Sequence, residues 1–248
     1  MTARTLARFG NAAALALAVA VFCGAGSAEA RPDPNDEYII VSGGPSLIEW
    51  EQYRKEAHRH DKWWGNFIRS ARIRIEQLQK YYKVPVNITW MVYRPAYESR
   101  ATEDGEPLLS YVESVRDKYK IRLIYFDSGD DIIRYLNEGN NRRKLKVGGF
   151  EYFGHSNKYC WTFDYSNHIL GASKAFLHER DLRGIKRGVF AKDAFAQSWG
   201  CHSGESFSAA FKRSTGVKMK GAIGKTDYSE IYRGILPFLS SPGGKWTN

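Results

Sequence analysis

The sequence stretch that decides the fold is Val147-Gly-Gly-Phe-Glu-Tyr-Phe-Gly-His155, which has a counterpart in Ala194-Phe-Ala-Gln-Ser-Trp-Gly-Cys201. Both are short apolar runs that carry aromatic residues and close on glycine, a pattern typical of buried strands rather than helices. Neighbouring parallel strands end at the same edge of a sheet, and open α/β folds place ligands and chemistry there. We therefore predict that His155 and Cys201 meet at one sheet edge as a candidate dyad.

Strand and helix patterns alternate along the rest of the chain. Apolar runs predict further strands at 38–41, 86–93, 121–126 and 217–223. Apolar residues spaced by three and four, together with capping and stop residues, predict helices at 47–57, 62–82, 108–119, 130–138, 172–180 and 207–216. The polar segment 96–107 is predicted to be a loop beyond a strand end. The alternation predicts an α/β fold with a mostly parallel sheet flanked by helices on both faces.

The first 30 residues have the pattern of a secretory signal. Arg4 and Arg8 precede an apolar stretch, and Ala28-Glu-Ala30 offers a cleavage site. An uncleaved anchor is the alternative, and in either case residues 31–248 are expected to be secreted or periplasmic. Their length suits one α/β domain, and no later segment is long and apolar enough to span a bilayer.

The mature chain is predicted to be basic. Removing Arg4, Arg8 and Glu29 from the 37 Lys and Arg and the 27 Asp and Glu leaves an excess of nine positive charges. Outside the cytoplasm this charge favours anionic envelope polymers or lipid head groups as partners, and no motif for reading nucleic acid is present. Solubility alone is the other explanation.

Two cysteines remain after the signal, Cys160 and Cys201, because Cys23 leaves with it. In an oxidising compartment the pair could form a disulfide, whereas a nucleophilic cysteine has to stay reduced. We expect Cys160 to be free of a disulfide. Cys201 lies between a predicted strand and a predicted helix, where the helix dipole and free amides would favour the thiolate.

Metal and cofactor sites are not predicted. His58 and His60 are two apart and do not share a helix face, and Asp61 is better explained as an N-cap. Cys201 with the adjacent His202 lacks a second cysteine pair for zinc. Gly43-Gly44 follows a strand but lacks the spacing of a dinucleotide-binding loop, and a tight turn needs glycine in any case.

The stretch from Val147 to Asp227 resembles the caspase-like cysteine peptidases, a group that includes gingipains, legumain and self-cleaving toxin domains. One strand ends in Gly-His, another ends in Gly-Cys 46 residues later, and a helix and Lys220-Gly-Ala-Ile-Gly224 follow. The resemblance implies a caspase-haemoglobinase fold, with Cys201 as nucleophile and His155 as general acid and base. It also implies an oxyanion hole of backbone amides near Ser156 and Gly200, no cofactor, and a protein or peptide substrate.

The resemblance also implies a pocket for the residue before the scissile bond, near the strand that follows the catalytic helix. Here that strand leads to Asp227, whose carboxylate would pair with Arg or Lys of the substrate. Lys225 in the same segment would instead favour an acidic residue.

One residue departs from the family pattern. The family has glycine after the histidine, whereas this chain has Ser156, which resists a positive φ if the oxyanion loop needs one. The alternative to a peptidase is therefore a catalytically silent domain of the same fold that binds an anionic envelope component or a protein partner.

Overall fold

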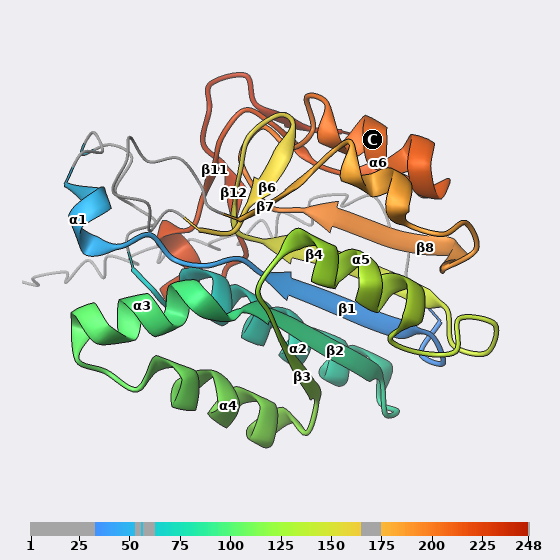
Figure 1. Ribbon diagram of the computed structural model, residues 1–248, viewed down its shortest axis with the longest axis horizontal. Coiled ribbons are helices and arrows are strands. Elements are labelled where there is room, and N and C mark those ends of the chain that lie inside the picture. Colours follow the sequence, from blue (N-terminus) through green and yellow to red (C-terminus); the bar gives the residue numbers. More distant parts are fainter. Residues whose placement is uncertain (1–32, 53–55, 57–62, 165–174, 248) are drawn as a thin grey trace, which may run out of the picture.

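A six-stranded sheet forms the centre of the computed structural model, which describes residues 33–52, 56, 63–164 and 175–247 (Figure 1). The strand order is β3-β2-β1-β4-β8-β9, and every neighbouring pair is parallel. The strands are β1 (Glu37–Ser42), β2 (Asn87–Tyr93), β3 (Arg122–Phe126), β4 (Val147–Phe153), β8 (Phe190–Ser198) and β9 (Met219–Lys220). The predicted parallel α/β sheet is confirmed, and the two strands that decide the fold, β4 and β8, pair directly.

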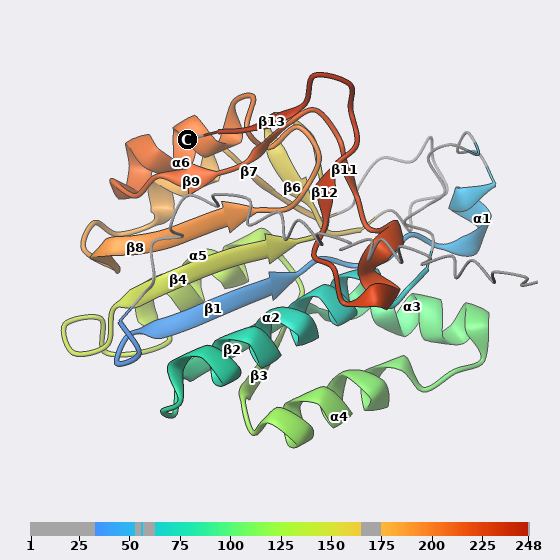
Figure 2. The same ribbon diagram turned by 180° about the vertical axis from the view of Figure 1, so that it is seen from behind.

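Helices cover both faces of the sheet. They are α1 (Ile48–Glu51), α2 (Asn66–Tyr82), α3 (Arg94–Asp104), α4 (Leu108–Tyr119), α5 (Gly129–Glu138) and α6 (Phe207–Thr215). Alternate residues of β1 enter two separate buried clusters: Ile39 lies in the cluster that includes residues of α5 and α6, and Ile40 in the one that includes residues of α2 and α4. Figure 1 shows α5 in front of the sheet, and Figure 2 shows α2 on the opposite face.

Local sequence explains where several helices begin and end. Ser128 and Asp131 form a capping box at the start of α5, and Gly216 in a left-handed conformation ends α6. Helix α2 begins at Asn66, and the predicted N-cap Asp61 lies outside the described residues, as does the predicted signal at 1–30.

The predicted loop at 96–107 is wrong, because most of it belongs to α3. Strand β2 ends at Tyr93, and Pro95 occupies the first turn of the helix that follows, where its missing N–H costs nothing. The segment is polar because only Ala96, Tyr97 and Arg100 are buried, and Arg100 pairs with Asp104 one turn later.

Two further predictions need correction. The helix predicted at 172–180 is contradicted over its described part, where β7 (Phe176–His178) pairs with β6 (Cys160–Thr162), which in turn pairs with β5 (His155–Ser156). The strand predicted at 217–223 is split into β9 and β10 (Ala222–Ile223). The break falls at Gly221, where a Cβ would lie 2.3 Å from Ser208 Oγ, so only glycine permits this close approach.

Short elements follow the carboxyl ends of the central strands. β10 pairs with β13 (Lys245–Trp246), and β11 (Thr226–Asp227) pairs with β12 (Phe238–Leu239). Two 3-10 helices, η2 (Asp181–Gly184) and η3 (Ser229–Arg233), complete the described chain. Among the described residues, no helix has the length and apolarity to cross a membrane.

Candidate active site

The turns that follow β4 and β8 are joined side by side. Trp199 N donates to Tyr152 O at 2.9 Å, and the Ser156 hydroxyl donates to Cys201 O at 2.6 Å. Gly200 allows this approach, since a Cβ at that position would lie 2.2 Å from Ser156 Oγ. The structure thus places His155-Ser156 against Gly200-Cys201, at the carboxyl edge of two adjacent parallel strands.

The His155 side chain is held from two directions. Its ring meets the edge of Phe67 of α2 at a centroid distance of 4.9 Å, and its Nε2 lies 3.4 Å from Ser46 Oγ. Ser46 belongs to the turn after β1 and is itself fixed by Arg100, which donates to Ser46 O at 2.7 Å. The imidazole is 8% exposed, so its orientation is set by packing as well as by hydrogen bonding.

The Cys201 thiol packs against Thr226 of β11. Thr226 N donates to Cys201 Sγ at 3.3 Å, and Sγ lies 3.8 Å from Thr226 O and 3.5 Å from Thr226 Oγ1. The Thr226 hydroxyl donates onward to Trp199 O at 2.8 Å, which ties the segment to the end of β8. An N–H directed at sulfur stabilises the thiolate, and a carbonyl accepts from the thiol, so Thr226 can serve both protonation states.

The expected contribution of a helix N-terminus to the thiolate is corrected by the geometry. Helix α6 begins at Phe207, six residues after Cys201, whereas the influence of a helix dipole is confined to its first turn. The amide of Phe207 donates to Lys158 O, and that of Ser208 donates to Ser203 O. The amide that reaches the sulfur comes from Thr226 instead.

Ser156 occupies its position without backbone strain. Among the described residues other than glycine, only Lys83, Lys120 and His202 have positive φ. Ser156 does not have a positive φ, so the conformation that serine was expected to resist does not occur at this position. His202, directly after Cys201, is the residue in the left-handed conformation (φ 60°), and its Nδ1 lies 2.6 Å from Glu205 Oε1.

Asp227, the predicted pocket residue, directly follows Thr226. It is half-buried, and its Oδ1 accepts from N of Ser229, the first residue of η3, at 2.6 Å. Lys225 N donates to Ser241 Oγ at 2.8 Å. The structure thus brings the 225–227 segment against the Cys201 turn, with one carboxylate oxygen of Asp227 engaged in a local turn.

The glycine pair after β1 uses its amides internally. Gly43 N donates to Phe153 O and Gly44 N to Phe163 O, at 2.9 and 2.8 Å. These amides are therefore not directed at a phosphate. Within the described residues, no group of three or more His, Cys, Asp and Glu is arranged to hold a metal ion, and His58, His60 and His168 lie outside them.

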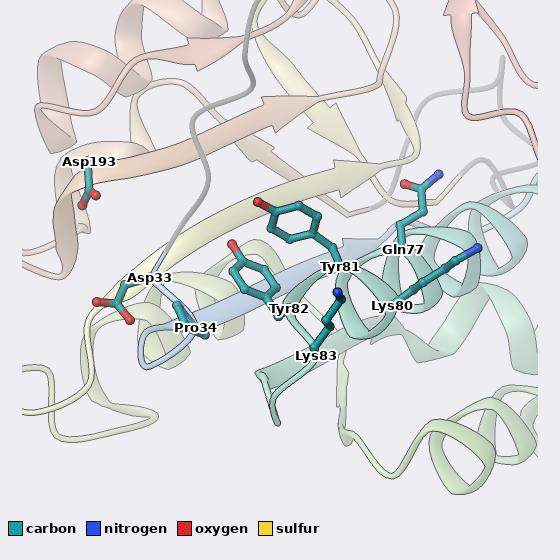
Figure 3. Close-up of a pocket in the computed structure, with 8 residues that line it drawn as sticks. All are labelled: Asp33, Pro34, Gln77, Lys80, Tyr81, Tyr82, Lys83 and Asp193. Carbon is teal, nitrogen blue, oxygen red and sulfur yellow. The ribbon is translucent and has the colours of Figure 1, made fainter.

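A large cleft lies at the other edge of the sheet. It measures about 1040 Å³ and is lined by residues at the C-terminal end of α2 and by Asp33 and Asp193 near the amino ends of β1 and β8 (Figure 3). Its acidic side chains crowd Asp36, whose pKa is raised by burial and by the charges of Asp33 and Asp193. The cleft is thus at the opposite end of the strands from His155 and Cys201.

Sequence reasoning missed Ser46, Phe67 and Thr226, which surround the two predicted side chains. None of them belongs to a recognisable motif, and each comes from a segment far from its partner in sequence. Comparisons with known proteins give no match for this chain among family models, curated proteins or solved structures.

Proposed function

We propose that this protein is an exported cysteine endopeptidase of the caspase-like type, with Cys201 as nucleophile and His155 as general acid and base. The observation that carries the proposal is the hydrogen bond from Ser156 Oγ to Cys201 O (2.6 Å). It joins the turn that bears a histidine to the turn that bears a cysteine, at the sheet edge where α/β folds place their chemistry.

The reaction would proceed by acyl transfer. His155 accepts the thiol proton, the sulfur attacks the peptide carbonyl carbon, and the carbonyl oxygen becomes an oxyanion held by backbone amides near Ser156 and Gly200. The C–N bond then breaks as His155 protonates the departing amine, leaving a thioester on Cys201. Water, deprotonated by His155, attacks the thioester, the C–S bond breaks, and the proton returns to sulfur.

Neighbouring residues would position these two groups. The Ser46 hydroxyl faces Nε2 of His155 and so fixes which side of the imidazole points toward Ser46. Phe67 limits rotation of the ring. Thr226 N–H supports the thiolate between turnovers. Asp227 would select Arg or Lys before the scissile bond, and Lys225 would act in the opposite sense.

One observation favours the second candidate function, a silent domain of the same fold that binds an anionic envelope component or a protein. His155 is 8% exposed and lies under Phe67, so a substrate has little direct access to the imidazole. In that case the two side chains serve packing, as a buried histidine and a small apolar thiol do elsewhere.

A peptide library separates the two candidates. Residues 31–248 are incubated with the library and new termini are read by mass spectrometry, for the unaltered protein and for Cys201→Ala and Cys160→Ala. We expect cleavage after Arg or Lys with the unaltered protein and with Cys160→Ala, and none with Cys201→Ala, whose fold is checked by circular dichroism. Equal cleavage by Cys201→Ala would contradict the proposal.

A further inference from the structure

A second concave site lies between helices α2 and α4, on the α2 face of the sheet. It is a pocket of about 300 Å³ whose walls include Trp63, Trp64, Ile68, Arg69, Arg72 and Tyr111. We call it the α2–α4 pocket. It lies at the N-terminal end of the helix whose Phe67 contacts His155, so it borders the candidate active site without being part of it.

The pocket carries positive charge that the described chain does not neutralise. Arg69 donates to Tyr232 O at 3.0 Å, and its Nε is buried and has no hydrogen-bond partner among the described residues. Arg72 likewise has no carboxylate partner within the described chain. By contrast, Arg74 on the same helix pairs with buried Glu151 at 2.7 Å.

The helix itself adds to this charge. The first turn of α2 contains no acidic residue, and its N-cap, Gly65, offers no side-chain acceptor. Because Gly65 also lines the pocket, the positive end of the helix dipole lies at the same site as the two guanidinium groups. An anion bound here would meet all three without competition from a carboxylate of the described chain.

Aromatic side chains form the rest of the wall. Trp64 stacks on Tyr111 at a centroid distance of 5.9 Å and an interplanar angle of 23°. Trp63 is 41% exposed, and the Arg69 guanidinium lies 5.9 Å from its ring centroid. Exposed tryptophan beside arginine is the composition of binding hot spots rather than of an ordinary solvated surface.

The lining also limits the chemistry of the ligand. Apart from the two guanidinium groups, the indole N–H groups of the two tryptophans and the Tyr111 hydroxyl, which donates to Glu106, the described lining offers no polar side-chain group. A sugar would leave several hydroxyl groups unpaired in such a site, which is costly. The ligand that fits has one negative group joined to an apolar body.

We propose that the α2–α4 pocket binds a peptide segment in which a carboxylate side chain adjoins an aromatic or aliphatic residue. The carboxylate pairs with Arg69 and Arg72, and the apolar side chain packs on Trp63 and Trp64. The choice of a peptide rests on the proposed function, because the pocket borders the candidate catalytic edge and would hold a remote part of the substrate.

Binding is tested in the Cys201→Ala background, where no turnover occurs, by titration calorimetry. The probes are acetyl-Leu-Glu-Phe-Leu-amide and its Gln counterpart. We expect the Glu peptide to bind at least about tenfold more tightly, the usual effect of a charge-assisted pair. Arg72→Gln should remove the difference in affinity between the two peptides, and Trp63→Ala should weaken the binding of both. Arg213→Gln on α6, which removes the same charge, should leave both affinities unchanged.

Three results overturn the proposal. The first is equal binding of both peptides, and the second is an equal effect of Arg72→Gln and Arg213→Gln on binding. The third is that the protein binds anionic lipid vesicles but neither peptide, and that Arg72→Gln abolishes the vesicle binding. Its failure is distinguishable from that of the proposed function. Selective Glu-peptide binding by a protein that cleaves nothing supports the pocket and refutes the peptidase. Cleavage of peptide substrates by a protein that binds the Glu and Gln peptides equally supports the peptidase and refutes the pocket.

Discussion

The protein contains two cysteine and histidine pairs in different settings. Cys160 of β6 lies opposite His178 of β7 in an antiparallel strand pair, whereas Cys201 lies in the turn beside the turn that bears His155. Burial raises the pKa of the Cys160 thiol, and the carboxylates of Asp181 and Glu179 add to this effect, although a hydrogen bond to Asn157 lowers it. Cys201 Sγ instead accepts the N–H of Thr226.

The comparison shows that the two pairs differ in backbone setting and in the hydrogen bonds made by their side chains. His178 Nδ1 accepts from Arg180 N at 3.1 Å, so one ring nitrogen is used in a local turn. The Cys160 pair lies on two neighbouring antiparallel strands, β6 and β7, whereas the Cys201 pair lies at the carboxyl edge of a parallel sheet. Four predictions, each based on substitutions, test whether this difference is functional.

The largest effect is expected from the histidines. His155→Ala should lower kcat/KM for peptide cleavage by about two to four orders of magnitude, the usual contribution of general acid and base catalysis. His178→Ala, the matched control, should leave kcat/KM within about twofold. Steady-state kinetics on one peptide compares the variants, and equal losses in both would remove the distinction between the two pairs.

Substrate selection should depend on Asp227. Asp227→Ala should lower kcat/KM for cleavage after Arg, with a loss of about 1–3 kcal/mol of transition-state binding free energy. The reason is that the buried guanidinium of the substrate would lose its carboxylate partner. Lys225→Ala is the matched control and should not reduce it. A fluorogenic panel that varies only this position provides the measurement, and cleavage after Asp or Glu but not Arg or Lys would refute the role of Asp227.

A smaller effect is expected at Ser46. Ser46→Ala removes the hydroxyl that faces His155 Nε2 and should lower kcat about tenfold, the scale of one hydrogen bond, with KM unchanged. Because Ser46 acts through the imidazole, the pH dependence of kcat/KM should shift as well. A loss of activity with an unaltered pH profile would point to a purely structural role.

The smallest effect concerns the residue that departs from the family pattern. Ser156→Gly should lower the free energy of unfolding by about 1 kcal/mol, because it deletes the hydrogen bond to Cys201 O. It should not raise activity, since Ser156 has no positive φ to relieve. Urea unfolding and steady-state kinetics check both expectations, and a marked gain in activity would show that serine does impair the site.

The central sheet followed from the sequence because its strands are short apolar runs with clear ends. The bounds of α4 were predicted fully, and those of α5 to within one residue; α5 begins at a capping box and ends at a glycine. Helix α3 was missed because its exposed faces are polar, and β7 because three residues carry too little periodicity. Tertiary pairing decides such elements, not local pattern.

The candidate site also contains residues that the sequence pattern indicates and residues that it does not. His155 and Cys201 stand out because each follows an apolar strand and a glycine. Ser46 and Thr226 do not, since a lone hydroxyl has no signature and Ser46 is 109 residues from the histidine it faces. Only the strand order β1-β4-β8 brings their turns together.

The most direct test of the Cys201 and His155 pair is alkylation. Both thiols are reduced in the structure, so iodoacetamide labelling can be followed at each by peptide mass spectrometry from pH 5 to 10. We predict that Cys201 reacts at lower pH and faster than Cys160, whose raised pKa keeps it protonated, and that His155→Ala reduces this advantage while His178→Ala does not. Indistinguishable pH profiles at Cys201 and Cys160, unchanged by His155→Ala, would contradict the account.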